Sequence, residues 1–358
     1  MQRTYTTTIA LRAPLKPPSS HNLDHICRQL AENQKMRTAT QKSSTPEPAL
    51  IHHPATTTTT TTTLYQIKQN GLSQHNEPLI IAAANAVGTT QANSKYTPWP
   101  TGAIITDITS TPGELETFSF GFRNVLGITS YISQRTRPET LVHNSMLASK
   151  QSNPNANDYQ LLKHLVKYLY TTRKLRQHLK RNDTQSRGGI AQQLRIIATC
   201  DSDYAGCPIT RRRMSGLDIT LNIHNDDTFP LQTSIPILSR AKRQETVSNS
   251  SNEGELKSAI AAAKVLVYLQ NVLEFVEPNL AVPRLYCDNK GAIHMAHGIG
   301  KRKRSKHIDV KHFYIRELIS NGKITLHHID ADDNVSDAMT KSLGKNKFLK
   351  FRGLLNVK

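Results

Sequence analysis

The sequence is short of cysteine and of long apolar runs, and each of these shortages excludes a class of protein. The cysteines form no CxxC pair, so neither zinc binding nor a disulfide framework is expected; they are Cys27, Cys200, Cys207 and Cys287. Scattered cysteines fit a reducing compartment, the cytoplasm or nucleus, better than secretion. No apolar run approaches the ~20 residues that span a bilayer, so no membrane partner is expected.

Acidic residues are also scarce relative to basic ones. Lys and Arg number 46 against 27 Asp and Glu, which gives a net charge of +19. A chain this basic predicts a polyanionic partner, with nucleic acid ahead of an anionic membrane. The alternative interpretation is a basic but merely solvated surface.

The N-terminal third of the chain has the composition of a disordered region. Only 37% of the whole sequence is hydrophobic, and residues 1–115 contain "PLKPPSS" and the threonine tract Thr56–Thr63. Such segments bury too little apolar surface to offset the entropy lost on ordering. We therefore expect residues 1–115 to be largely disordered, apart from a helix or strand at Leu79–Val87.

Residues 116–185 have the pattern of a small helical segment. Apolar side chains recur at helical spacing, at Leu161, Leu162, Leu165, Val166 and Leu169. Asn155 or Asn157 would cap this helix. The basic residues that follow, up to 181, are expected to form its solvated end or a surface that tracks phosphates. A linker, 185–189, would separate this segment from the next.

From residue 190 the pattern becomes mixed α and β. The expected order is β-β-β-α-β-α-α-β-α, with strands at 194–200, 215–223, 233–239, 284–288 and 323–329 and a long helix at 250–275. Strict alternation predicts a half-buried second strand, with Asp218, Thr220 and Asn222 on its open face. Pro236 predicts that the third strand lies at an edge or contains a bend.

Four acidic residues fall at comparable places in this order. Asp201 and Asp288 each end a strand, while Glu255 and Asp337 each lie in the first turn of a helix. Strand ends and helix starts at one rim of a sheet can converge, and four carboxylates would then need counter-cations. Two Mg²⁺ ions would meet that need, and such a pair supports phosphodiester hydrolysis. The alternative for each acid alone is a capping or surface role.

Several stretches give these acids a family context. They are "CDSDYAG", "RRRMSG", "AKRQETVSNSSNEGELKSA", "LYCDNKGAI", "SKHIDVKHFYIREL" and "NVSDAMTKSL". Residues 190–345 thereby resemble the ribonuclease H domain of copia-type (Pseudoviridae) retrotransposon polyproteins. "FRNVLGITSYISQRTRP" and "SNPNANDYQLLKHLVKYLYTT" resemble the end of the reverse transcriptase just upstream. Residues 346–358 would form a C-terminal helix or tail.

The resemblance implies a fold and an activity. The fold would be α/β, a ribonuclease H-like mixed five-stranded sheet flanked by helices. The activity would be hydrolysis of the RNA strand of RNA–DNA hybrids with two Mg²⁺ or Mn²⁺ ions and no small-molecule cofactor. Asp201 and Asp288 would bind metal most directly, Glu255 would bind one ion and sense the RNA 2′-hydroxyl, and Asp337 would complete the second ion's ligands. Asp203 matches a supporting acid of the family motif.

Two basic runs are candidate nucleic-acid-binding residues. They comprise Arg211, Arg212 and Arg213, and Lys301, Arg302, Lys303, Arg304 and Lys306. We expect them to neutralise phosphates without reading sequence, so that affinity falls with salt. A solvated loop is the alternative for either run.

Departures from the family pattern keep a second interpretation open. Tyr204 and Ser239 stand where tryptophan is common, and Gly254 enters a helix start. No "YVDD"-like polymerase pair, "HHCC" integrase arrangement or "DSG" protease motif is found, so the chain is expected to be a fragment lacking the polymerase site. The alternative to a nuclease is a catalytically inactive, nucleic-acid-binding relic. A third interpretation is a junction resolvase of the same fold, but the "KHID" motif argues against it.

Overall fold

The computed structural model describes residues 64–68, 71–89, 94–100, 102–180, 193–203, 211–222, 234–298 and 309–358. All of them belong to one compact unit, Thr59–Lys358. The threonine tract, the linker at 185–189, Tyr204 and the basic run at 301–306 lie outside the described residues.

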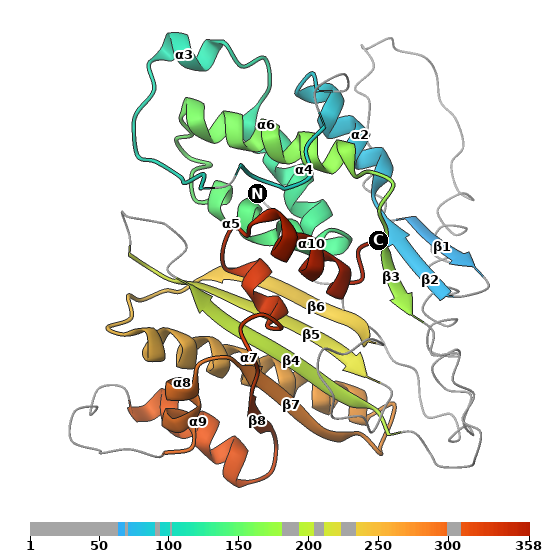
Figure 1. The fold of residues 1–358 in the computed structure, drawn as a ribbon, viewed down its shortest axis with the longest axis vertical. Coiled ribbons are helices and arrows are strands. Elements are labelled where there is room, and N and C mark those ends of the chain that lie inside the picture. Colours follow the sequence, from blue (N-terminus) through green and yellow to red (C-terminus); the bar gives the residue numbers. More distant parts are fainter. Residues whose placement is uncertain are drawn as a thin grey trace, which may run out of the picture. The chain divides into compact units, whose positions relative to one another are not determined.

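A mixed five-stranded sheet is the centre of the C-terminal half (Figure 1). Its strands are β4 (Arg195–Asp203), β5 (Met214–Asn222), β6 (Ser234–Arg243), β7 (Ala281–Cys287) and β8 (Thr325–His328), in the spatial order β6-β5-β4-β7-β8. The first three strands pair antiparallel, while β4, β7 and β8 pair parallel. The predicted mixed five-stranded sheet flanked by helices is therefore confirmed.

The edge strand β6 behaves as its proline predicts. Pro236 lies beside Thr220 of β5, where the register between the two strands shifts. Proline cannot donate a ladder hydrogen bond, so it is tolerated at an edge or a bulge, and β6 offers both. The prediction of an edge strand is confirmed.

The prediction of a half-buried β5 is wrong. Asp218 and Asn222 are buried, as are the apolar residues that alternate with them. Asp218 accepts a hydrogen bond from Ser239 Oγ at 2.6 Å on the neighbouring strand, which satisfies one carboxylate oxygen. Short-range alternation could not reveal this burial, because the elements that cover the second face of β5 lie more than 100 residues away in sequence.

The long helix α7 (Ser251–Glu274) packs on one face of the sheet, opposite to the face that the C-terminal segment covers. Ser250 caps it by accepting a hydrogen bond from the Glu253 backbone, as the serine-rich start predicts. By length and composition α7 could cross a membrane, but Leu256, Ile260 and Leu266 are buried against the sheet, while Tyr268 and Val272 are exposed. Helices α8 (Lys290–Ala296) and α9 (Asp309–Ser320) pack beside α7, and α9 ends before Gly322 at φ 64°.

The helical segment has its own apolar core. It comprises α2 (Glu77–Ala86), α3 (Pro112–Glu116), α4 (Phe122–Arg135), the 3₁₀ turn η1 (Pro138–Thr140), α5 (Leu141–Ala148) and α6 (Ala156–Thr171). All five members of the predicted α6 stripe are buried, and Asn155 caps the helix reciprocally with Asp158. The helix or strand expected at Leu79–Val87 is α2, whose Leu79 and Ile80 join this core. Trp99 joins it too, so part of the region expected to be disordered is ordered.

The predicted basic helix end after α6 is a strand instead. The helix stops at Thr171, and β3 (Gln177–Lys180) pairs antiparallel with β2 (Gly71–His75), which pairs with β1 (Leu64–Lys68). The partner strand lies more than 100 residues upstream, so local spacing could not indicate it.

The C-terminal segment returns to the sheet and covers its second face. The 3₁₀ turn η3 (Val335–Met339) lies against β4 and β5, and the expected C-terminal helix is α10 (Lys345–Leu354). A β-carbon on Gly216 of β5 would lie 2.6 Å from the Ser336 carbonyl oxygen, so glycine permits this close approach. The segment thereby brings its own acid, Asp337, to the sheet.

Candidate active site

Asp201 and Asp288 are placed by two parallel strands. Cys200 of β4 is directly paired with Cys287 of β7, and each cysteine precedes one of the aspartates. The carboxyl ends of parallel strands share one edge of a sheet, so the two aspartates lie together there. Asp201 is buried and Asp288 is half-buried.

Asp337 reaches the same edge from η3. Asn334 caps this turn through the Ser336 backbone and donates its side-chain amide to the Cys200 carbonyl oxygen at 3.1 Å. The hydroxyl groups of Thr199 and Ser336 lie 2.6 Å apart, which adds a second link between η3 and β4. These contacts fix Asp337, which is 1% exposed, beside the end of the central strand.

Glu255 comes from the start of α7 on the other face of the sheet. Ser258, one turn further along, donates a hydrogen bond to the Asp201 carbonyl oxygen at 2.7 Å and so ties α7 to β4. Glu255 is buried, and its Oε2 atom has no hydrogen-bond partner. A buried carboxylate oxygen without a donor is costly, and a bound cation would satisfy it.

The structure brings the four predicted acids to one rim, in two overlapping groups. One carboxylate oxygen from each of Asp201, Asp288 and Asp337 lies within 4.8 Å of the others. Glu255 forms a second group with Asp288 and the Cys287 sulfur, within the same limit. Asp288, which directly follows β7, contributes a carboxylate oxygen to both groups.

Burial and mutual repulsion hold Asp201, Glu255 and Asp288 toward their protonated forms. Desolvation, with repulsion from Asp337 and Asp288, raises the pKa of Asp201 to about 7. Desolvation, with repulsion from Asp201, raises the pKa of Glu255 to about 10. Desolvation also raises the pKa of Asp288, against a hydrogen bond from Asn334. Carboxylates in this state favour a site at which divalent cations displace protons.

Sequence reasoning missed three polar residues that contact these acids. Lys341 and Lys347 each place Nζ 2.9 Å from an oxygen of Asp337, and the Thr340 hydroxyl donates to Asp201. Burial lowers the pKa of Lys341, but attraction from Asp201 and Asp337 outweighs it and raises that pKa above its usual value. Thr340 and Lys341 belong to the matched "TKSL" stretch, which was the available signal, whereas nothing in the sequence pointed to Lys347.

The donor set fits Mg²⁺ or Mn²⁺. The first group contributes three carboxylates, and these ions prefer oxygen ligands and keep several of their waters. The orphaned Glu255 oxygen adds a donor on the α7 side. The lysines on Asp337 are half-exposed, so they can rearrange when a cation binds.

The first basic run lies near this rim. Residues 211–213 precede β5, whose first residue pairs with Asp203 at the end of β4. Arg211 and Arg212 are exposed, while Arg213 is half-buried against Gly254. A β-carbon on Gly254 would lie 2.3 Å from Arg213 Cδ, so this glycine, a departure from the family pattern, makes room for the arginine.

Comparison with known proteins supports the resemblance seen in the motifs. The chain is 26% identical over 237 residues to the retrovirus-related Pol polyprotein from transposon RE1 of Arabidopsis thaliana, covering 66% of this chain and 15% of that protein. It is 24% identical to the corresponding polyprotein from transposon TNT 1-94 of Nicotiana tabacum, covering 63% of this chain and 16% of that protein. It is 31% identical over 146 residues to the uncharacterized mitochondrial protein AtMg00810 of Arabidopsis thaliana, covering 40% of this chain and 52% of that protein. The chain thus spans about 15% of the length of the polyproteins it matches.

Solved structures that align with the chain are ribonuclease H domains. The N-terminal RNase H domain of Rv2228c from Mycobacterium tuberculosis aligns with 45% of this chain and 98% of its own, at 13% identity and a TM-score of 0.30. RNase H1 from Halobacterium salinarum aligns with 44% of this chain at 15% identity and a TM-score of 0.27. No protein-family model matches the chain. The sequence relatives confirm the resemblance, and the chain is a homologue of part of the Pol polyproteins of copia-like plant transposons.

Proposed function

We propose that this chain is a divalent-metal-dependent ribonuclease H that hydrolyses the RNA strand of RNA–DNA hybrids. The observation that carries the proposal is the meeting of four acids from four separate elements at one rim of the sheet. The relationship to transposon Pol polyproteins and the matched motifs support this substrate class. Its cofactors would be two Mg²⁺ or Mn²⁺ ions.

The proposed roles are those that the family resemblance implies for these side chains. Asp201 and Asp288 would hold the cations most directly, and Glu255 would hold one of them and contact the RNA 2′-hydroxyl. Asp337 would complete the second set of ligands, with Lys341 and Lys347 rearranging when the cation binds. When bound, the two ions would stabilise the attacking and leaving oxygens of an in-line displacement.

Binding of the hybrid would rest on the basic residues. Arg211 and Arg212 are exposed beside the end of β4, near the acids, where they can neutralise phosphates. The second basic run, at 301–306, remains a prediction. These contacts carry no base specificity, so the proposed enzyme recognises the hybrid rather than a sequence.

One observation favours a second candidate, a catalytically inactive nucleic-acid-binding relic. Both carboxylate oxygens of Asp337 are engaged by lysines, which compete with a cation for the same charge. In a relic the lysines would take the place of metal and keep the fold stable, while the basic surface still bound nucleic acid.

An end-labelled RNA–DNA hybrid separates the two candidates. We expect the full chain with Mg²⁺ to cleave only the RNA strand, and Asp288→Asn to lose at least ~100-fold in rate, since even indirect disturbance of a metal site costs ~10–100-fold. Asp330→Asn, at an exposed acid outside the site, is the matched control. Binding without hydrolysis by the folded wild-type chain would support the relic, and cleavage of both strands would indicate another nuclease.

A further inference from the structure

A buried cysteine lies beside the candidate active site and has no part in the proposed reaction. Cys287 ends β7 and is directly paired with Cys200 of β4, and both are free thiols. The sequence has no CxxC pair, so only strand pairing brings the two together. Because side chains alternate along a strand, the cysteines face α7 while Asp201 faces η3.

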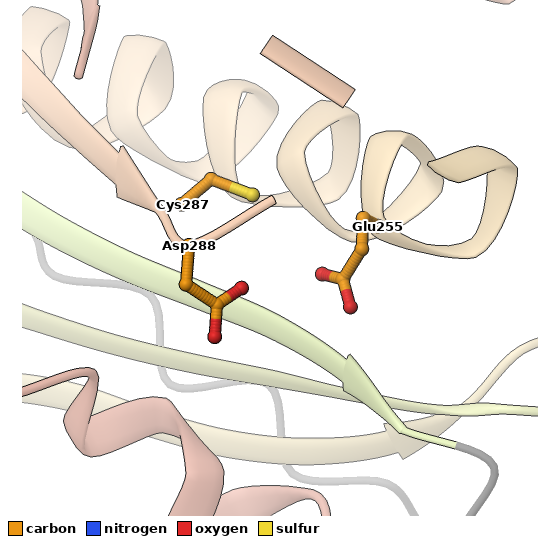
Figure 2. A group of neighbouring side chains, drawn as sticks. All are labelled: Glu255, Cys287 and Asp288. Carbon is orange, nitrogen blue, oxygen red and sulfur yellow. The ribbon is translucent and has the colours of Figure 1, made fainter. Parts of the chain in front are cut away.

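The Cys287 sulfur belongs to a compact group of potential ligands. Its Sγ and one oxygen each from Glu255 and Asp288 lie within 4.8 Å of one another. Figure 2 shows the three side chains converging between the end of β7 and the start of α7. Glu255 is only 5% exposed, and its Oε2 atom has no hydrogen-bond partner, so a buried polar atom points into the group.

The mixture of donors selects a different cation from the oxygen-only group. Mg²⁺ prefers oxygen ligands, whereas thiolates bind Zn²⁺ and other soft cations. Zinc bonds of ~2.3 Å to sulfur and ~2.1 Å to oxygen place tetrahedral ligands ~3.5 Å apart. Modest side-chain rotation could bring the three atoms to that spacing. Three protein ligands would leave a fourth position for water.

We propose that Cys287, Glu255 and Asp288 form a site for a thiophilic divalent cation such as Zn²⁺. Binding would displace the thiol proton to solvent and form the sulfur–metal bond, with no oxidation or reduction. The site shares two carboxylates with the proposed Mg²⁺ ligands, so the soft cation would exclude Mg²⁺ from them. This inference does not depend on nuclease activity, because it concerns binding alone.

Cadmium is the probe for this site, because a cadmium thiolate has an ultraviolet charge-transfer band. The experiment uses the full chain with Cys27→Ser and Cys207→Ser, which leaves Cys200 and Cys287 as its cysteines. We expect Cd²⁺ to produce the band at a one-to-one ratio. Cys287→Ser should abolish the band and lower Cd²⁺ affinity by more than the ~10–100-fold that loss of an indirect partner costs.

Two further variants separate loss of a ligand from loss of the fold. Cys200→Ser changes the paired cysteine and should keep both the band and the affinity. Glu255→Gln should keep the band but lower the affinity at least ~10-fold. A band that survives in Cys287→Ser, or that disappears in Cys200→Ser alone, would overturn the proposal. Unchanged Cd²⁺ affinity in Glu255→Gln would also overturn it.

Discussion

At the residue scale, the negative charge of the buried acids in the candidate active site has to be neutralised by nearby cations. Asp201, Asp288 and Asp337 would repel one another strongly at this distance without positive charge nearby. Within the described residues, Lys341 and Lys347 form ion pairs with Asp337. The sequence pointed to all four acids, because each stands at a strand end or helix start. Lys341 lies in a matched motif, but its ion pair with Asp337 and that of Lys347 could be recognised only once η3 and α10 were placed.

Lys341→Met should destabilise the metal-free protein. Asp337 would keep one lysine partner but lose the other from a buried carboxylate. We expect a loss of about 1–2 kcal/mol, below the 3–5 kcal/mol typical of a broken buried pair, because Lys341 is 37% exposed. Urea unfolding in the presence of a chelator measures this change. Saturating Mg²⁺ should recover most of the loss if the cation replaces the ammonium group.

Lys350→Met provides the matched control for this variant. Lys350 pairs with Asp333, which lies outside the four acids, and its side chain is 46% exposed. Surface pairs of this kind contribute about 0–1 kcal/mol, so its effect should be small and independent of Mg²⁺. Equal destabilisation by the two variants would contradict a special role for Lys341.

At the scale of elements, position in the sheet decides which residues become functional. The order of the elements along the chain could be predicted from the sequence pattern, and Pro236 indicated an edge or a bend in β6. The burial of Asp218 could not, since η3 covers β5 from more than 100 residues further along the chain. The β3 strand was missed for a related reason, because its partner β2 is distant in sequence. Local pattern thus predicted most of the elements, and tertiary contacts decided the rest.

Gly216→Ala tests the contact that positions Asp337. The added methyl group would meet the Ser336 carbonyl oxygen at 2.6 Å and Met339 Cβ at 2.9 Å, so η3 must move away. We expect about 1–3 kcal/mol of destabilisation, as for other overpacked positions, together with weaker binding of Mg²⁺. Thermal unfolding with and without Mg²⁺ measures both effects.

Gly127→Ala is the corresponding control. Gly127 lies within α4, and a β-carbon there meets no atom within 4 Å. Alanine is the better helix former by about 1 kcal/mol, so this variant should be neutral or stabilised, with unchanged Mg²⁺ binding. A Gly216→Ala protein as stable as Gly127→Ala would show that η3 does not depend on close contact with β5.

At the scale of the whole molecule, the protein needs binding partners of both charges. A charge of +19 favours a polyanionic partner, while the acids at the rim of the sheet need cations of their own. Composition predicted the partner class, but only the fold could show that the acids meet.

Stability of the metal-free protein should fall as pH rises. Asp201 and Glu255 have folded-state pKa values of about 7 and about 10, above the ordinary values of 3.8 and 4.5. A raised carboxyl pKa means that the unfolded chain loses its proton first, so unfolding becomes easier above pH ~4. The loss from Asp201 should be complete near pH 7, and that from Glu255 should continue toward pH 10. Chemical denaturation across this range measures the slope.

Divalent cations should reduce the fall in folding stability as pH rises. Mg²⁺ binds the ionised carboxylates of the folded state, so its stabilising effect should grow as pH rises. Asp218 supplies an internal reference, because burial raises its pKa to about 6 outside the four acids, and its contribution should remain with Mg²⁺ present. Stability that rose with pH in the metal-free protein would contradict the burial of unpaired acids at the sheet rim.

Calorimetric titration of the full chain with Mn²⁺ tests most directly whether these acids form one cation site. We expect binding to the wild-type chain and a loss of at least ~10-fold in affinity in both Asp201→Asn and Asp288→Asn, with Asp330→Asn unchanged. Wild-type affinity in the first two variants, in protein shown to be folded, would mean that the acids meet without holding metal, and the proposed nuclease would be excluded.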